Sequence, residues 1–213
     1  MTDKILLKAE NIKKYYRVSA GFLNKKDKKI VDDVSLELHE GETLGLVGES
    51  GCGKTTLGKT LIHLIPATEG KVYFDGEELT DESYDRHYTD IQMIFQDPLS
   101  ALNPRMTVFD IIAEPLRVCH VCEENEIESR VYGLMDEVGI HRHLAFRYPH
   151  EFSGGQCQRI GIARALAIEP KLIVCDEPVS ALDVSIKAQI INMFGELQEK
   201  HGMAYPFITH DLL

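Results

Sequence analysis

The eight residues GESGCGKT, at positions 48–55, decide the fold of this chain. They match the pattern GxxxxGK[ST], follow the short apolar run Leu44–Val47, and precede a segment whose leucines recur with helical spacing. A glycine-rich turn between a strand and a helix points backbone N–H groups at phosphate oxygens, and the helix N-terminus adds the positive end of its dipole. The stretch therefore predicts a P-loop, in which Lys54 reaches the β- and γ-phosphates and the Thr55 hydroxyl coordinates Mg²⁺.

A second predicted strand ends in two acids. The apolar run Leu172–Cys175 is typical of a buried strand, and Asp176 and Glu177 follow it directly. Burying carboxylates is costly unless they have cationic partners or a catalytic task. Alone, these acids would favour the N-terminus of the next helix. Together with the P-loop, Asp176 suits Mg²⁺, and Glu177 suits a general base that polarises the attacking water.

The segment SGGQ, at positions 153–156, opens another predicted helix. Ser153 and Gln156 have the spacing of a capping box. The serine hydroxyl and the N–H groups of Gly154 and Gly155, at a helix N-terminus, also form a second phosphate cradle. This surface and the P-loop cannot be the same, so we expect the second cradle to serve a nucleotide bound to another subunit.

The order of the predicted elements favours an α/β fold. Strand patterns occur at 6–12 and 31–39, separated by a basic, glycine-containing loop at 21–29, and again at 44–47, 71–74, 91–95, 172–175 and 204–209. Helical spacing follows the P-loop as far as Pro66, fills residues 107–167, and returns at 186–197. We therefore predict a mostly parallel sheet flanked by helices, with an N-terminal antiparallel β subdomain and an inserted α-helical subdomain.

Composition narrows the class of protein. The 213 residues suffice for one large domain, and 44% of them are apolar. The net charge of −11 argues against a general nucleic-acid binder, whose affinity would come from many Lys and Arg side chains. No apolar run approaches the length of a membrane helix, and five cysteines without a regular framework suit reduced thiols inside a cell.

The motifs and their order resemble the nucleotide-binding domain of ATP-binding cassette (ABC) transporters, over essentially the whole chain. The segments QMIFQDP (92–98) and LNPRMTV (102–108) further resemble ATP-binding subunits of dipeptide and oligopeptide permeases. The resemblance identifies Gln96 as the glutamine-loop residue, Asp183 as the D-loop acid, His210 as the switch histidine, and Tyr16, rather than Tyr15, as the aromatic that stacks on adenine.

The resemblance implies ATP and Mg²⁺ as cofactors. ATP contacts within one subunit are expected from Tyr16, Gly48, Glu49, Ser50, Gly51, Cys52, Gly53, Lys54, Thr55 and Thr56, and from the opposite subunit from Ser153, Gly154, Gly155, Gln156 and Asp183. Catalytic roles fall on Glu177, His210, Gln96 and Lys54, and Mg²⁺ ligation on Thr55, Gln96 and Asp176. Two such domains are expected to close head-to-tail over two ATP molecules.

The resemblance also implies an ATPase subunit that powers peptide import at the cytoplasmic face of a membrane. Its expected partners are a second ATPase subunit, in a homo- or heterodimer, the transmembrane permease subunits and, indirectly, an extracytoplasmic solute-binding protein; no nucleic acid is expected. Two alternatives stay open: a nucleotide-binding fragment without turnover, and an importer ATPase for another small solute such as nickel or glutathione.

The resemblance further predicts how the chain is organised. Residues 1–213 are expected to form a single nucleotide-binding domain. Within it, 1–96 and 168–213 form the α/β core with the β subdomain, and 97–167 form the helical subdomain with the SGGQ segment. Family members continue beyond the position of Leu213, so we expect a domain that is short at its C-terminus.

Overall fold

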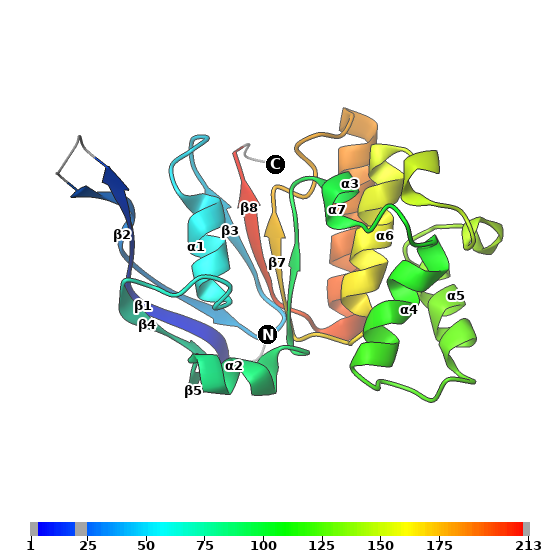
Figure 1. Cartoon of the computed structure of the whole chain (residues 1–213), viewed down its shortest axis with the longest axis horizontal. Helices are drawn as coiled ribbons and strands as arrows, with labels where there is room; N and C mark the ends of the chain where they lie inside the picture. Colours follow the sequence, from blue (N-terminus) through cyan, green and yellow to red (C-terminus); the bar gives the residue numbers. More distant parts are fainter. Residues whose placement is uncertain (1–3, 20–24, 211–213) are drawn as a thin grey trace. The chain divides into compact units, whose positions relative to one another are not determined.

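The computed structural model describes residues 4–19 and 25–210 (Figure 1). The chain divides into two compact units, residues 1–88 with 204–213, and residues 89–203. Residues 21–24 of the predicted loop, and Leu213, lie outside the described residues. Within the described ranges, none of the helices combines the length and the hydropathy of a membrane-spanning segment.

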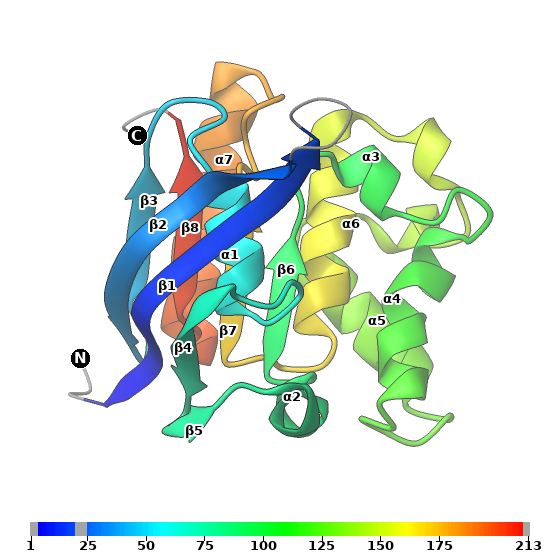
Figure 2. The same cartoon turned by 60° about the vertical axis from the view of Figure 1, so that its left-hand side comes forward.

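An antiparallel sheet dominates the first unit. Its strands lie in the order β2 (Lys25–His39), β1 (Ile5–Ser19), β4 (Glu69–Phe74) and β5 (Glu77–Glu78). The first two strands are longer than predicted. Beyond Lys13, where the pairing of β1 with β4 ends, β1 and β2 continue as a two-stranded hairpin, as Figure 2 shows. This outer hairpin consists of residues 14–19 paired with residues 25–31. The prediction of a loop over 21–29 was wrong for residues 25–29, because the outer part of the hairpin has polar residues on both faces and lacks the alternation that marks a half-buried strand.

The first unit also contains a parallel pair of strands, β3 (Thr43–Val47) and β8 (Tyr205–Thr209). Strand β8 is buried up to Ile208, but β3 is only half-buried, and 49% of Val47 is exposed. The strand predicted at 44–47 is therefore present, but its continuous apolar run, which is typical of a buried strand, is wrong as a guide to its burial. Among the described residues β3 pairs with β8 alone, so its second edge is open.

Two helices complete the first unit, α1 (Lys54–Leu61) and α2 (Asp81–His87). Helix α1 ends before the predicted stop at Pro66. His63 adopts a left-handed conformation with φ 57°, and the N–H groups of Leu64 and Ile65 both turn back to the carbonyl oxygen of Lys59. A residue in this conformation just past the last turn is a common way to end a helix.

The second unit contains the parallel strands β6 (Ile91–Ile94) and β7 (Leu172–Asp176) and most of the helices. Every residue of β7 is buried, as the apolar run Leu172–Cys175 predicts, and the burial extends to Asp176 at its end. The helices are α3 (Pro98–Ala101), α4 (Val108–Val118), α5 (Ile127–Glu137), α6 (Gly154–Leu166) and α7 (Val184–His201), with short 3₁₀ helices at Arg142–Leu144 and Pro149–Glu151. The predicted α/β class, with parallel strands, an antiparallel sheet and an inserted group of helices, is confirmed.

Two arginines of α6 fix neighbouring segments to this helix. The guanidinium of Arg164 donates to the carbonyl oxygen of Ala101 at 2.7 Å, which holds the end of α3. Arg159 donates to the carbonyl oxygen of Val138 at 2.7 Å and to Gln189 of α7 at 3.2 Å. Hydrogen bonds from a charged donor are stronger than neutral ones, so these arginines hold α3, the end of α5 and α7 to α6.

Strand β7 carries a buried thiol whose ionisation opposes folding. Cys175 is fully buried, and burial raises the pKa of its thiol well above the usual range because the thiolate would lose its hydration. The folded state therefore keeps this proton at a pH where the unfolded chain, with a thiol pKa of about 8.5, releases it. Stability from this group is full below that pH and falls as the pH rises above it, by at most about 1.4 kcal/mol per pH unit.

We therefore expect the free energy of unfolding of the parent chain to fall more steeply between about pH 8.5 and 10 than that of Cys175→Ala. Urea titrations of both proteins across this range measure the difference, in which contributions from other ionising groups cancel. Equal slopes for the two proteins would contradict the expectation.

Candidate functional site

The GESGCGKT turn joins β3 to α1 and has the backbone of a phosphate-binding loop. Gly51 and Gly53 have φ values of 79° and 102°, and α1 begins directly at Lys54. A Cβ atom on Gly53 would lie 2.5 Å from the backbone oxygen of Ile30 in β2. Only glycine fits there, so the turn packs closely against β2. The first N–H groups of any helix have no acceptor within the helix, and those of α1 lie at this turn.

The ammonium group of Lys54 lies over this turn. Its Nζ atom donates to the carbonyl oxygens of Gly48 at 2.6 Å and Glu49 at 2.9 Å, and it lies 4.0 Å from Sγ of Cys52. The lysine side chain is thus folded back across the loop, with its charge beside the glycine-rich backbone. This places one cation and the positive end of the α1 dipole at the same turn, an arrangement suited to a polyphosphate.

His210 lies at the same edge of the parallel pair as the turn. Val47 and Thr209 are paired in register, so Gly48 and His210 each follow a paired residue at the carboxyl ends of neighbouring parallel strands. Ligand-binding residues in α/β folds gather at such ends. The first unit therefore brings together two sequence-predicted elements, the turn and His210, that are far apart in the chain.

Tyr16 lies on the outer hairpin, with 42% of its surface exposed. The Nζ atom of Lys14 lies 5.2 Å from the centre of its ring. Tyr15 is engaged elsewhere, because its hydroxyl group donates to the carboxylate of Asp32 and Lys29 covers its ring. A lysine thus lies equally close to each ring, and what favours Tyr16 over Tyr15 as a ring available for stacking is its greater exposure and the bond that holds the Tyr15 hydroxyl group.

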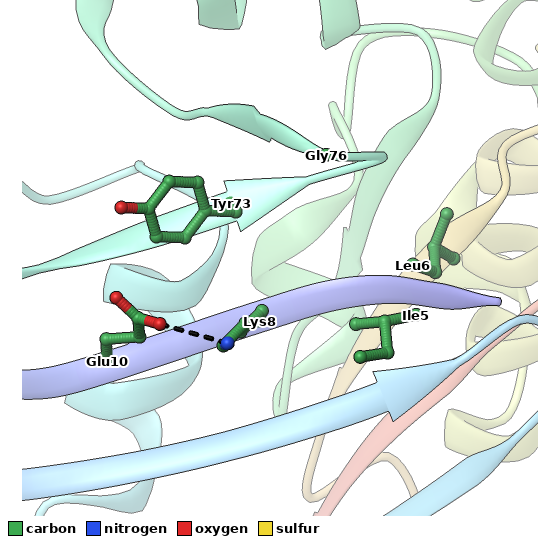
Figure 3. A pocket seen from close by; sticks show the side chains of 6 residues that line it. All are labelled: Ile5, Leu6, Lys8, Glu10, Tyr73 and Gly76. Carbon is green, nitrogen blue, oxygen red and sulfur yellow. Dashed lines mark ion pairs between the residues drawn. The ribbon is translucent and has the colours of Figure 1, made fainter.

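The cavities lined by described residues of the first unit include the following two. One, of about 350 Å³, borders the GESGCGKT turn and is lined by parts of β2 and β3 together with Cys52, Gly53 and Lys54. The other, of about 330 Å³, lies on the antiparallel sheet beside Lys8, Glu10 and Tyr73 (Figure 3). Lys8 is ion-paired with Glu10 and Glu37, at 3.0 and 3.4 Å, and no predicted site residue lines this second cavity.

In the second unit the structure brings Gln96 and Glu177 together. The side-chain amide of Gln96 donates to Oε2 of Glu177 at 3.0 Å, although the two residues are 81 positions apart. Strands β6 and β7 are paired with Ile94 opposite Cys175, so the residues that follow them meet at one edge. Asp176 is 3% exposed at the end of β7, which places a nearly buried carboxylate next to this pair.

Glu177 has an unusual backbone conformation. Its φ is 47°, in the left-handed region that glutamate rarely adopts. Such residues cost of order 1–3 kcal/mol and are found mostly where function requires a particular orientation. The turn directs the Glu177 side chain away from the line of β7 and onto the amide of Gln96.

The predicted capping box at the start of α6 is confirmed. The N–H of Ser153 donates to Oε1 of Gln156 at 3.0 Å, and the N–H of Gln156 donates to Oγ of Ser153 at 3.4 Å. A Cβ atom on Gly155 would lie 2.7 Å from a methyl group of Ile186 in α7, so a larger residue at this position would require the Ile186 side chain to move. Asp183 precedes α7 and is exposed, with no capping bond from its side chain.

Sequence reasoning missed two contributors to this geometry. Ile30 supports the GESGCGKT turn from β2, and the bond between Gln96 and Glu177 joins two predicted residues directly. The position of Ile30 depends on a β-bulge in β2, which the pattern of apolar and polar residues does not reveal. The second follows only once β6 and β7 are known to be neighbours.

The fold and the glycine-rich turn define a P-loop protein of the α/β class. Residues 31–180 match the ABC transporter family, and the chain belongs to this family.

The chain is similar along nearly its whole length to two oligopeptide transport ATP-binding proteins called OppF. That of Salmonella typhimurium is 53% identical over 98% of this chain, and that of Bacillus subtilis is 50% identical over all of it. The chain spans 65% and 69% of these two relatives, respectively. A solved dimer of the ATP-binding cassette MJ0796, bound to ADP and Pi, matches with a TM-score of 0.85 and 30% identity, over 97% of this chain and 88% of that one.

Proposed function

We propose that this chain is the ATP-binding and ATP-hydrolysing subunit of an importer for oligopeptides. The observation that carries the proposal is the hydrogen bond between Gln96 and Glu177 at the ends of β6 and β7. It fixes the orientation of a carboxylate suited to accept a proton from water. The names of the OppF relatives support peptides as the transported solute.

The residues available for a metal fit Mg²⁺. Thr55, Gln96 and Asp176 offer a hydroxyl, an amide oxygen and a carboxylate, which are the hard oxygen ligands that Mg²⁺ prefers. When bound, Mg²⁺ would neutralise developing negative charge on the phosphates. In this proposal Lys54 and the backbone of residues 48–56 hold the β- and γ-phosphates, and Tyr16 stacks on the adenine.

Glu177 is the general base of the proposed reaction. It polarises a water molecule for attack on the γ-phosphorus, while Gln96 keeps the carboxylate in one orientation. His210, at the edge of the parallel strands that also carries the P-loop, stabilises the γ-phosphate. The protein thus contributes mainly positioning and charge, as is general in phosphoryl transfer.

The second half of each site comes from a partner ATPase subunit in this proposal. Ser153, Gly154, Gly155, Gln156 and Asp183 contact the nucleotide of the opposite subunit. The similarity to a dimeric, ADP-bound cassette supports such a pair. ATP then favours the closed dimer, since only that state contacts the nucleotide from both sides. The remaining partners are permease subunits and an extracytoplasmic solute-binding protein, with this chain at the cytoplasmic face of the membrane.

The test is Mg²⁺-dependent ATP hydrolysis as a function of protein concentration, with Glu177→Gln as the blank. We expect a rate that rises faster than linearly and is absent in the blank, because each site needs two subunits. ATP binding without turnover at any concentration would favour the alternative of a binding fragment.

The transported solute needs a separate measurement. In cells that lack their own oligopeptide ATP-binding subunit, expression of this chain is expected to restore uptake of a labelled tripeptide. Restored uptake of nickel or glutathione, with no uptake of the tripeptide, would overturn the assignment to peptides.

A further inference from the structure

The outer part of the β1–β2 hairpin has one face that carries several cations. Beyond Tyr15, the register pairs Tyr16 with Lys28, Arg17 with Asp27, and Val18 with Lys26. Residues directly opposite each other in an antiparallel pair project to the same face, and neighbours along a strand project to opposite faces. Tyr16, Val18, Lys26 and Lys28 therefore share one face, and Arg17 and Asp27 share the other.

The face that carries Tyr16 is well suited to an anion. Lys14 projects to it as well, since its Nζ atom lies 5.2 Å from the Tyr16 ring centre while donating to the carbonyl oxygen of Pro66 at 2.6 Å. Lys26 and Lys28 are both exposed. Of the residues assigned to this face by register and contact, three are lysines and none is acidic. The chain as a whole has a net charge of −11, so this face is positively charged on a protein that is negatively charged overall.

A β-bulge connects this face to the P-loop. Lys14 is paired with Val31 and Tyr15 with Lys29, so Ile30 is an extra residue on β2. Bulges turn a side chain away from its regular direction. A Cβ atom on Gly53 would lie 3.1 Å from Cγ2 of Ile30, which shows that this side chain packs against the P-loop. At about 3.3 Å per residue, Lys28 lies within roughly 7 Å of Ile30 along β2.

These positions define a path for a bound nucleotide. A base stacked on Tyr16, with its phosphates in the P-loop, must span the distance between these two points. The stretch of β2 from Lys28, opposite Tyr16, to Ile30, against Gly53, runs between the same two points. Lys28 is the cation of this stretch that shares a face with Tyr16.

We propose that Lys28 is a further nucleotide-binding residue, whose ammonium group contacts the ribose–phosphate portion of a nucleotide stacked on Tyr16. The inference rests on the proposed function, because it takes the P-loop and Tyr16 as the two ends of the nucleotide. Lys14 and Lys26 add positive charge on the same face without a direct contact. The ligand class is a nucleoside di- or triphosphate, and the contact requires the phosphate charge.

The test compares Lys28→Glu with Arg17→Glu. Both variants reverse one charge on the same hairpin, but Arg17 lies on the face away from Tyr16. ATP and adenosine affinities are measured by competition with a fluorescent ATP analogue. Lys28→Glu is expected to weaken ATP binding about tenfold, because a carboxylate replaces a cation within a few ångströms of the phosphates. Arg17→Glu is expected to weaken it by less than about twofold, since exposed charges farther away are screened. Adenosine binding is expected to stay unchanged in both.

Three outcomes would overturn the inference. Equal loss of ATP affinity in both variants would show that the net charge of the hairpin matters and that Lys28 makes no direct contact. Unchanged ATP binding in Lys28→Glu would remove the contact altogether. Absence of ATP binding in the parent chain would overturn the proposed function, and this inference with it. The neutral variant Lys28→Gln, expected to weaken ATP binding by about threefold, keeps the test decisive if the charge reversal prevents folding.

Discussion

Glu177→Gln is expected to lower the rate of Mg²⁺-ATP hydrolysis by about 10²–10⁴-fold and to leave ATP binding unchanged. Glutamine has the shape of glutamate and its Oε1 atom can still accept the hydrogen bond from Gln96, but it cannot take a proton from water. The variant therefore removes the chemistry and preserves the local structure. Steady-state hydrolysis and equilibrium ATP affinity, measured on the same preparation, separate the two effects.

Glu169→Gln is the matched control for this variant. Glu169 is also a glutamate of the second unit with a positive φ, of 52°, and it is exposed, with its carboxylate 2.9 Å from Arg130. Its replacement is expected to leave hydrolysis unchanged. If Glu177→Gln retained the parent rate, or if the control lost as much activity, Glu177 would not be the base.

The second large effect is expected from Gly53→Ala. The alanine would have to keep φ near 102° and would bring its Cβ atom to 2.5 Å from the backbone oxygen of Ile30. Either the turn or β2 must move, and the strain of a few kcal/mol corresponds to a loss of ATP affinity of about 100-fold or more. Calorimetric ATP titration and a urea unfolding curve measure the two consequences.

Gly51→Ala separates backbone strain from the clash. Gly51 has a similar positive φ, of 79°, but a Cβ atom there would meet nothing within 4 Å. We expect a clearly smaller loss of affinity and stability in this variant. Equal losses in Gly51→Ala and Gly53→Ala would mean that the left-handed backbone, and not the contact with β2, makes glycine necessary in this loop.

The parts of the fold that the sequence predicts are those in which one local pattern decides the outcome. The run Leu172–Cys175 is apolar throughout because both faces of β7 are covered, and the structure buries each of its residues. Ser153 and Gln156 form their capping box within one turn of chain, so their spacing alone predicts it. The glycine-rich turn lies between a strand and a helix, as its motif predicts.

The remainder depends on interactions between distant segments. The outer hairpin shows no alternation, because no core selects one of its faces, and its strands were underestimated for that reason. Val47 is exposed because β3 is an edge strand that pairs with β8 alone among the described residues. The sequence of Leu44–Val47 carries no information about which strands lie beside it. The left-handed backbone of Glu177 and the extra residue Ile30 in β2 are departures from regular structure, and regular residue patterns cannot predict them.

The pairing of β3 with β8 also determines the order in which parts of the chain can fold during translation. The second unit is a continuous stretch of chain, residues 89–203, whereas the first is completed only by residues 204–213. On the ribosome, the strand that leads into the P-loop has to wait for residues 205–209 to emerge before it gains its neighbour. Contacts between such distant segments are slow to form. Until then both edges of β3 are unpaired. Chaperone binding or aggregation at these edges therefore competes with the pairing of β3 with β8 that completes the nucleotide site.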